Sequence, residues 1–336
     1  MYKLKNYDWP KELRLIINKK CNYCCSFPGG GCKWCHEDGV HYKKGGNKKE
    51  VNVEDYLFLS RVLKDTFDLE KVKVGAMEPL LYKDLGLLLS GLKKDLNFAE
   101  VSLTTNGYLL DKNVEVLEKS GLDNLTVSMH AFNANDYKDI TGVDAFDRVK
   151  KCLEEISRQK RFKSVKVNRV LLRSEGVWQD LQNFFDWATE YGFVIKLYKL
   201  LWSKTIKSED YFKYYLPWES LMVFLRERAK LIETKNYNYV GRERLFWQLE
   251  SGLKLETDVF LEKKSKERAN VCKKCELASF CQEGILSYGL EINDEIVLSA
   301  CLLRDDLCVD LYKEVKERNE KMLRLKVGDF VYSMIK

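Results

Sequence analysis

Short apolar segments alternate with helix-like segments along residues 13–201, and this alternation constrains the fold more than any other feature of the sequence. The strand-like segments are 13–17, 72–74, 101–104, 124–128, 165–168 and 194–201. Apolar residues at helical spacing fill the intervals, in segments that begin at Asn52 or cover 85–96, 112–119, 149–156 and 178–191. Because parallel strands need long crossover connections, this pattern predicts an α/β fold with a partial (β/α)6 barrel.

Cysteines concentrate directly after the first predicted strand, at an end where parallel sheets bind their ligands. Five of the eleven cysteines of the chain lie in one fifteen-residue loop. The spacing of Cys32 and Cys35 lets both sulfur atoms reach one metal centre, and a third ligand must come from Cys21, Cys24 or Cys25. Four thiolates hold a structural zinc ion, whereas three thiolates on a [4Fe–4S] cluster leave one iron open. Spacing alone leaves a zinc site, a disulfide and a cluster open.

This loop resembles the cluster loop of radical S-adenosylmethionine (SAM) enzymes. An asparagine follows Cys21, and the aromatic residue Trp34 stands directly before Cys35, as in that superfamily. A Gly-rich insertion separates the cysteines, so the spacing is C-x10-C-x2-C instead of the usual C-x3-C-x2-C. The resemblance implies a [4Fe–4S] cluster on Cys21, Cys32 and Cys35, with SAM on the open iron and Trp34 beside SAM. A ligand set that begins with Cys25 remains an alternative.

Motifs after the next strands continue the resemblance, in the order found in the GTP 3′,8-cyclase family of molybdenum-cofactor biosynthesis. A Glu-Pro turn follows strand two, a Thr-Asn-Gly turn follows strand three, and a serine ends strand four. The resemblance implies that SAM contacts residues of these turns and strand ends and one apolar residue at the end of strand six, which together are Met77, Glu78, Thr104, Asn106, Ser128 and Leu201. For Leu201, core packing is an equal alternative. His130 stands where the family has an acid, and we expect it to be an ordinary surface or supporting histidine.

The substrate-binding positions of the cyclase family map onto Arg14, Lys73, Lys166 and again Thr104. All four residues are polar or basic, and basic groups that gather at strand ends suit a triphosphate or another anion. Alternation alone also places some lysines on the outer face of any strand, so a solvated surface role remains open. The resemblance implies a small-molecule substrate such as a nucleotide, and no catalytic side chain is assigned.

A second group of cysteines follows the predicted barrel, with the spacing C-x2-C-x5-C-x19-C. Its members are Cys272, Cys275, Cys281 and Cys301. Such a group can hold a cluster or a zinc ion. Its position resembles the Twitch domain of the cyclase and of SPASM/Twitch relatives, which implies a second, auxiliary [4Fe–4S] cluster, a core barrel at 1–205 and a Twitch-like domain at 206–336. Residues 288–301 predict a hairpin, in which Gly289 and Glu291 replace the arginine pair of the cyclase.

Composition indicates the compartment and the partners. The chain of 336 residues is 45% hydrophobic, and it has neither a leader nor an apolar run near the ~20 residues that span a bilayer. We therefore expect a cytoplasmic protein, in which thiols stay reduced and serve metals instead of disulfides. We ascribe the net charge of +6 to a lysine-rich surface, and we expect neither a membrane nor a nucleic acid as partner.

The resemblance also implies the reaction: reductive cleavage of SAM to methionine and a 5′-deoxyadenosyl radical, which takes a hydrogen atom from the substrate. The electron would come from a reductant such as flavodoxin or ferredoxin. Residues 202–260 suggest no chemistry, and the tail from Asp310, with Leu311, Val315 and Met322, predicts an amphipathic helix. Two other functions remain open: a peptide-modifying Twitch/SPASM enzyme, and a non-enzymatic zinc or iron–sulfur protein that never cleaves SAM.

Overall fold

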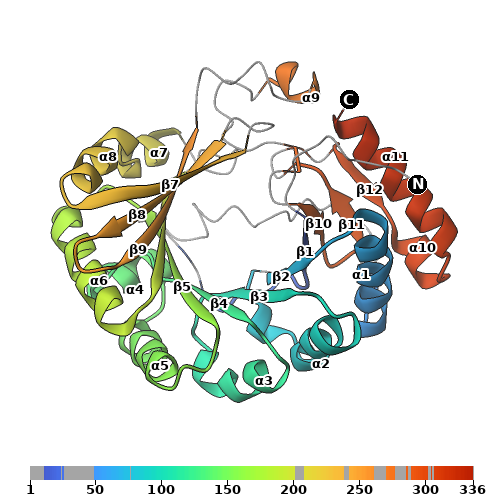
Figure 1. Ribbon diagram of the computed structural model, residues 1–336, viewed down its shortest axis with the longest axis horizontal. Helices are drawn as coiled ribbons and strands as arrows, with labels where there is room; N and C mark the ends of the chain where they lie inside the picture. Colours follow the sequence, from blue (N-terminus) through green and yellow to red (C-terminus); the bar gives the residue numbers. More distant parts are fainter. Residues whose placement is uncertain are drawn as a thin grey trace.

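The computed structural model shows a strongly curved sheet with helices on its outer, convex side (Figure 1). The residues that it describes are 11–23, 25, 49–75, 77–200, 208–237, 242–260, 270–276, 285–286, 289–301, 304 and 306–335.

Within this described part, twelve strands form one sheet. The strands are β1 (Glu12–Ile16), β2 (Lys71–Gly75), β3 (Glu100–Thr105), β4 (Asn124–Ser128), β5 (Ser164–Leu171), β6 (Val194–Lys199), β7 (Ala229–Tyr237), β8 (Arg242–Leu249), β9 (Lys254–Phe260), β10 (Leu290–Ile292), β11 (Val297–Ser299) and β12 (Cys308–Asp310). Their order across the sheet is β12-β11-β10-β1-β2-β3-β4-β5-β6-β9-β8-β7.

The α-helices are α1 (Val53–Phe67), α2 (Leu85–Ser90), α3 (Val114–Lys119), α4 (Ala134–Thr141), α5 (Phe146–Arg158), α6 (Val177–Tyr191), α7 (Ser208–Tyr214), α8 (Trp218–Arg226), α9 (Asn270–Lys273), α10 (Tyr312–Lys316) and α11 (Glu320–Ile335). A π-helical turn, η2 (Gly91–Asp95), extends α2, and short 3-10 turns are η1 (Pro79–Leu81) and η3 (Leu110–Lys112). No helix in these ranges combines the length and the apolarity that a bilayer crossing requires.

The predicted α/β fold is confirmed. Strands β1 to β6 are parallel neighbours in chain order, with crossover helices between them, and β10 and β9 continue the parallel arrangement at the two ends. The sheet stays open, so the barrel is partial (Figure 1). Asn52 caps α1 as predicted: its side chain accepts from the main-chain N–H of Asp55, and the Asp55 carboxylate accepts from the N–H of Asn52.

Alternation along the strands separates an outer apolar face from an inner polar face. Leu13, Leu15, Val72 and Val74 are at most 1% exposed and pack in the main core cluster with residues of the covering helices. Successive side chains of a strand point to opposite faces, so the polar residues between these apolar ones lie on the concave side. Arg14 is one of them, and it is paired in register with residues of both neighbouring strands.

Two features before the C-terminal segment depart from the sequence analysis. Helix α4 lies before α5, where only one helix was predicted, and residues 202–260 contribute the antiparallel ribbon β7–β8–β9 beside β6.

The C-terminal segment agrees with the sequence analysis in one feature and departs from it in another. The predicted hairpin at 288–301 is confirmed as β10 and β11. The tail forms two helices, α10 and α11, instead of one. The prediction that Met322 lies on the apolar face is wrong, because the side chain is 42% exposed.

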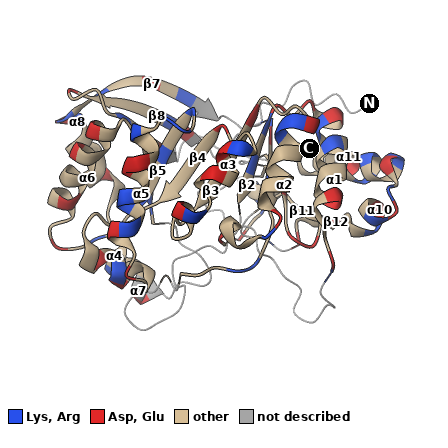
Figure 2. Ribbon diagram, turned by 90° about the horizontal axis from the view of Figure 1, so that it is seen from below, with Lys and Arg blue, Asp and Glu red and all other residues tan. Residues whose placement is uncertain are grey.

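Helix α10 and the turn that follows it are held against α1 by charge. Asp55 is 1% exposed, and its carboxylate lies 2.7 Å from Lys316 Nζ and 3.0 Å from Arg318 Nη1. On the outer helices, charges of both signs are interspersed instead of sorted (Figure 2), as a solvated surface requires. The C-terminal segment is therefore fixed to the N-terminal end of the sheet, where β10 pairs with β1.

Gly289 allows β10 to approach β1. Its φ is +90°, and a Cβ atom added there would lie 2.0 Å from the carbonyl oxygen of Glu12. We predict that Gly289→Ala lowers the free energy of unfolding by roughly 3 kcal/mol or more, because the strain of positive φ adds to a main-chain clash. Gly192→Ala is the matched control, since Gly192 also has positive φ, +68°, but no atom within 4 Å of the added Cβ.

Urea or thermal unfolding of the two variants measures this difference. We expect the control to lose only about 1 kcal/mol. Equal losses for the two variants would show that β10 does not pack on β1 as described.

Candidate cofactor and substrate site

Glu78 joins the loops that follow β2 and β3. Its side chain is fully buried, and its carboxylate accepts hydrogen bonds from the main-chain N–H of Leu80 (3.0 Å), the hydroxyl of Thr105 (2.6 Å) and the main-chain N–H of Asn106 (2.7 Å). Burial raises the pKa of Glu78, and these three hydrogen bonds reduce but do not cancel the effect. The carboxylate is thus engaged within the protein, and the contact with SAM predicted for Glu78 stays a prediction.

The main chain of the same turn is tied to the start of the cysteine loop. The amide of Asn18 donates to the carbonyl oxygen of Glu78 at 2.9 Å, and the N–H of Glu78 donates to the carbonyl oxygen of Lys20 at 2.9 Å. Met77 lies beside this turn and is partly buried. The loops that follow β1, β2 and β3 therefore form one connected unit.

Cys21 lies on this unit, and its sulfur accepts hydrogen bonds. The main-chain N–H of Tyr23 lies 3.4 Å from Cys21 Sγ, and the side-chain amide of Asn106 lies 3.7 Å from it. That amide also donates to Asn22 Oδ1 at 2.7 Å, which fixes its orientation. N–H donors around a cysteine sulfur suit a thiolate that holds a cluster, because hydrogen bonds to such sulfurs tune the reduction potential. The environment of Cys21 therefore fits its predicted role.

The other residues of the predicted first cluster site, Cys32, Trp34 and Cys35, lie outside the described residues. Within the described ranges, no three His, Cys, Asp or Glu side chains converge as a metal site. Cys25, the alternative ligand, packs against a small apolar cluster around Leu172 and Leu200. The choice between Cys21 and Cys25 stays a prediction.

Two buried tyrosines fix the described start of the cysteine loop. The hydroxyl groups of Tyr23 and Tyr137 lie 2.8 Å apart, and the Tyr23 hydroxyl also donates to the carbonyl oxygen of Asn106 at 3.3 Å. Burial raises the pKa of both phenols, so both stay protonated and neutral. Tyr137 belongs to α4, which thereby anchors the loop to the barrel.

At the end of β4, Ser128 and His130 occupy different surroundings. Ser128 lies opposite Asn168 on the inner face. His130 Nδ1 accepts from the main-chain N–H of Val170 at 3.1 Å, and burial together with the charge of Arg169 lowers its pKa to about 3. The imidazole is therefore neutral and fixed to a neighbouring strand, which supports the expectation of a supporting role. Leu201 lies outside the described residues.

The predicted substrate residues converge on the inner face. Arg14 and Lys73 are paired in register on β1 and β2, while Thr104 and Lys166 are both paired with Thr126 of β4. Burial and the neighbouring cations, Arg14 first, lower the pKa of Lys73 to about 7. Placement on one face is thus shown, whereas the binding roles of these residues stay predictions.

Four charged residues on this face escaped the sequence analysis. Glu256 and Asp258 of β9, Lys196 of β6 and Arg244 of β8 form ion pairs there: Lys196 Nζ lies 2.9 Å from Asp258, and Arg244 Nε lies 2.9 Å from the same carboxylate. Lys166 Nζ lies 2.5 Å from Glu256. The sequence carries one signal that could have revealed them: Glu256 and Asp258 alternate with Leu255, Thr257 and Val259, which is a strand pattern.

The second cysteine group is only partly described. Cys272 lies in α9, and the main-chain N–H of Cys275 donates to its carbonyl oxygen at 3.2 Å, while Cys301 follows β11. Cys281 lies outside the described residues. The guanidinium of Arg304, which pairs with Asp306, also interacts with the Cys275 thiol. The predicted ligand set of this site is therefore neither assembled nor excluded.

Comparison with known proteins gives one family and several relatives. The sequence model described as Radical SAM superfamily matches residues 16–188. A protein named probable GTP 3′,8-cyclase from Saccharolobus islandicus is 40% identical over 139 residues, which is 41% of this chain and 41% of that protein. Proteins of the same name from Sulfurisphaera tokodaii and Thermoplasma volcanium are 28% and 27% identical over 327 and 317 residues.

Coverage differs between these relatives. The match spans about two fifths of the Saccharolobus islandicus protein, but 95% and 90% of the other two and 96% and 93% of this chain.

Among solved structures, Streptococcus suis SuiB has a TM-score of 0.57 at 18% identity, over 87% of this chain and 60% of SuiB. That likeness concerns the fold alone. The family model runs from the last residue of β1 through most of α6 and so covers half of the chain, including the loops that follow β1 to β4. This chain therefore belongs to the radical SAM superfamily of enzymes.

Proposed function

We propose that this protein cleaves SAM reductively and abstracts hydrogen from a small anionic metabolite or nucleotide. The observation that carries the proposal is the convergence of Arg14, Lys73 and Lys166 on the inner face of the barrel, next to the loops that follow β1 to β4. Two relatives named probable GTP 3′,8-cyclase match this chain over 90% or more of their own length, and they support a nucleotide as the substrate. Guanidinium and ammonium groups suit a carboxylate or a phosphate.

Cys21, Cys32 and Cys35 would hold the [4Fe–4S] cluster. The residues that would contact SAM are Trp34, Met77, Glu78, Thr104, Asn106, Ser128 and Leu201. When bound, the cluster and SAM supply the electron and the 5′-deoxyadenosyl radical that takes the hydrogen atom. The protein's own part is to fix positions. The Glu78 carboxylate fixes the turn against Thr105 and Asn106, and the Asn106 amide donates to Cys21.

We further propose a second [4Fe–4S] cluster on the later cysteines, Cys272, Cys275, Cys281 and Cys301, in a Twitch-like domain at 206–336 behind a core at 1–205. It would anchor substrate or accept an electron. A reductant such as flavodoxin or ferredoxin and a cytoplasmic location belong to the same proposal. Glu291, where the cyclase family has an arginine, lies 3.6 Å from Arg14, which argues against a strict copy of GTP cyclisation.

Removal of single cysteines separates the two proposed clusters. We predict that Cys35→Ala abolishes the first cluster and 5′-deoxyadenosine formation, whereas Cys275→Ala retains uncoupled SAM cleavage, because only the first cluster would transfer the electron to SAM. Cys152→Ala is the control, since Cys152 is buried in α5 and belongs to neither cysteine group. Iron content and 5′-deoxyadenosine are measured after anaerobic reconstitution. Full SAM cleavage by Cys35→Ala would refute the ligand assignment.

The positioning role of Glu78 is tested by Glu78→Gln. The amide keeps the shape but turns an N–H group toward a donor, so we predict that SAM binds about tenfold more weakly and that the free energy of unfolding falls by about 1–3 kcal/mol. Glu175→Gln, at an exposed position, is the control and should change neither. Equilibrium dialysis with labelled SAM measures the first effect. Unchanged SAM affinity in a destabilised variant would show that the Glu78 contacts are purely structural.

A further inference from the structure

The ribbon β7–β8–β9 brings acidic groups to the proposed substrate face. β9 lies parallel to β6, and Lys196 is in register with Glu256. On the other side of β9, Arg244 of β8 is in register with Asp258. Glu256 and Asp258 are each 8% exposed, so the ribbon buries two carboxylates in the barrel interior.

These carboxylates neutralise the basic groups of β5, β6 and β8. Glu256 Oε1 lies 2.5 Å from Lys166 Nζ, and Asp258 lies 2.9 Å from both Lys196 and Arg244. Burial alone would raise the pKa of Glu256, but the charges of Lys166, Lys196 and Arg244 outweigh burial and lower it, so Glu256 is ionised. Across the face, Glu291 of β10 lies 3.6 Å from Arg14.

Lys73 differs from the other inner cations. Among the residues that the structure describes, no carboxylate lies within ion-pair distance of its ammonium group, although Glu12 raises its pKa from a greater distance. Burial and the charges of Arg14, Lys196 and Lys166 lower the pKa to about 7. Lys73 therefore gains most from a ligand that supplies one negative charge.

We propose that the inner face takes a substrate with a single acidic group, a carboxylate or a phosphate monoester, at Lys73 and Arg14, and that Glu256 and Asp258 exclude a polyphosphate. The proposal rests on the function proposed above, since it concerns the substrate of the same site. Among the described residues, the inner cations Arg14, Lys73, Lys166, Lys196 and Arg244 face the inner carboxylates Glu12, Glu256, Asp258 and Glu291, so the face offers little net positive charge to a triphosphate. The inner hydroxyl of Thr104, which has no hydrogen-bond partner among the described residues, can donate to the acidic group.

Calorimetry on the anaerobically reconstituted full chain tests the exclusion. Sodium acetate, orthophosphate and tripolyphosphate are titrated separately near neutral pH. We expect tripolyphosphate to bind no more tightly than the better of the two simple anions, and we expect Glu256→Gln to raise the tripolyphosphate affinity about tenfold or more. The tighter of acetate and orthophosphate identifies the acidic group.

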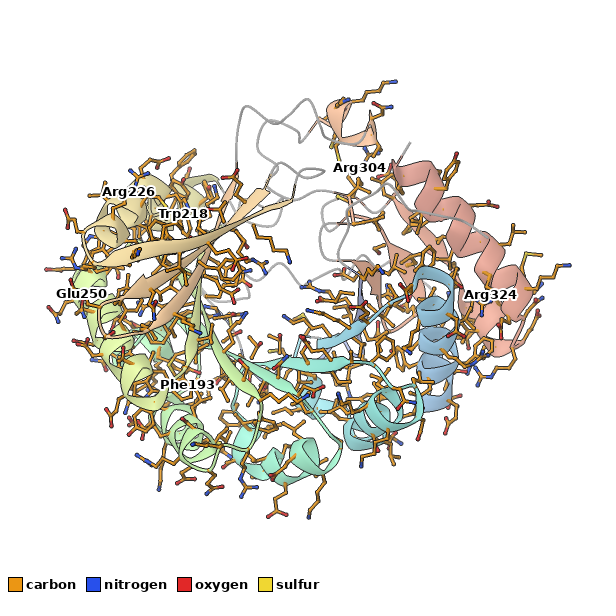
Figure 3. All side chains as sticks on the ribbon, in the orientation of Figure 1. Phe193, Trp218, Arg226, Glu250, Arg304 and Arg324 are labelled. Atoms are coloured by element: carbon orange, nitrogen blue, oxygen red, sulfur yellow. The ribbon has the colours of Figure 1, made fainter. Side chains whose placement is uncertain are left out.

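Glu250→Gln is the matched control. It removes the same charge from the same ribbon, but Glu250 is exposed in the turn after β8, and Figure 3 places it on the outer edge of the arc. It should leave all three affinities unchanged. A wild-type protein that binds tripolyphosphate more tightly than both simple anions, or equal effects of the two glutamine variants, would overturn the proposal.

A second pair of variants keeps the test valid if Glu256→Gln fails to fold. We expect Lys73→Gln to weaken the preferred simple anion about tenfold, whereas Lys71→Gln, at an exposed position of the same strand, leaves it unchanged. Retained binding in Lys73→Gln would overturn the proposal. Formation of 5′-deoxyadenosine is followed separately. Its absence with the wild-type protein refutes the proposed function, whereas product formation together with anion affinities opposite to those expected refutes only this inference.

The same site predicts a pH dependence. Acetate favours protonated Lys73, so its affinity should fall about tenfold as the pH rises from about 6 to 8 through the Lys73 pKa of about 7. Arg14, Glu12, Lys166 and Lys196 face Lys73, and Lys196, with a pKa lowered to about 8 by burial, is held by Asp258. A pH-independent acetate affinity would contradict the role of Lys73.

Discussion

The structure depends on the alternation of side chains along a parallel sheet that is covered by helices on one side only. Leu13, Leu15, Val72 and Val74 bury the outer face, so every intervening residue is placed on the concave side regardless of its polarity. Basic residues there are costly unless they are paired or used. The ion pairs of Lys166, Lys196 and Arg244 and the lowered pKa of Lys73 are both consequences of this one constraint.

The loops at the carboxyl ends of the strands gain their order from a second, smaller set of contacts. Glu78 receives three hydrogen bonds from the turn after β2 and the end of β3, and Asn106 continues the network to Cys21. A proposed cluster ligand is thus positioned through polar groups in the loops that follow three separate strands. Hydrogen bonds of this kind also adjust the sulfur's electronic properties, which links the packing of the loops to redox chemistry.

Much of the barrel could be predicted from the sequence, because each of β1 to β6 carries its own apolar pattern and its own crossover helix. The motif residues that the structure describes lie at or just after the carboxyl ends of the strands, as the order of strands and motifs in the sequence predicts. The ribbon β7–β8–β9 could not be predicted in the same way, since acidic residues such as Glu256 and Asp258 suggest an exposed segment until Lys166 and Lys196 are known to face them. The contacts of Glu78 could not be predicted from the sequence either, because Thr105 and Asn106 are remote from Glu78 along the chain.

The most direct test of the radical SAM assignment is anaerobic reconstitution of the wild-type chain with iron and sulfide, followed by SAM and dithionite. The account predicts about eight irons per chain, as two [4Fe–4S] clusters require, and formation of 5′-deoxyadenosine. Tightly bound zinc in place of iron, with no 5′-deoxyadenosine, would contradict it and would leave a structural metal protein.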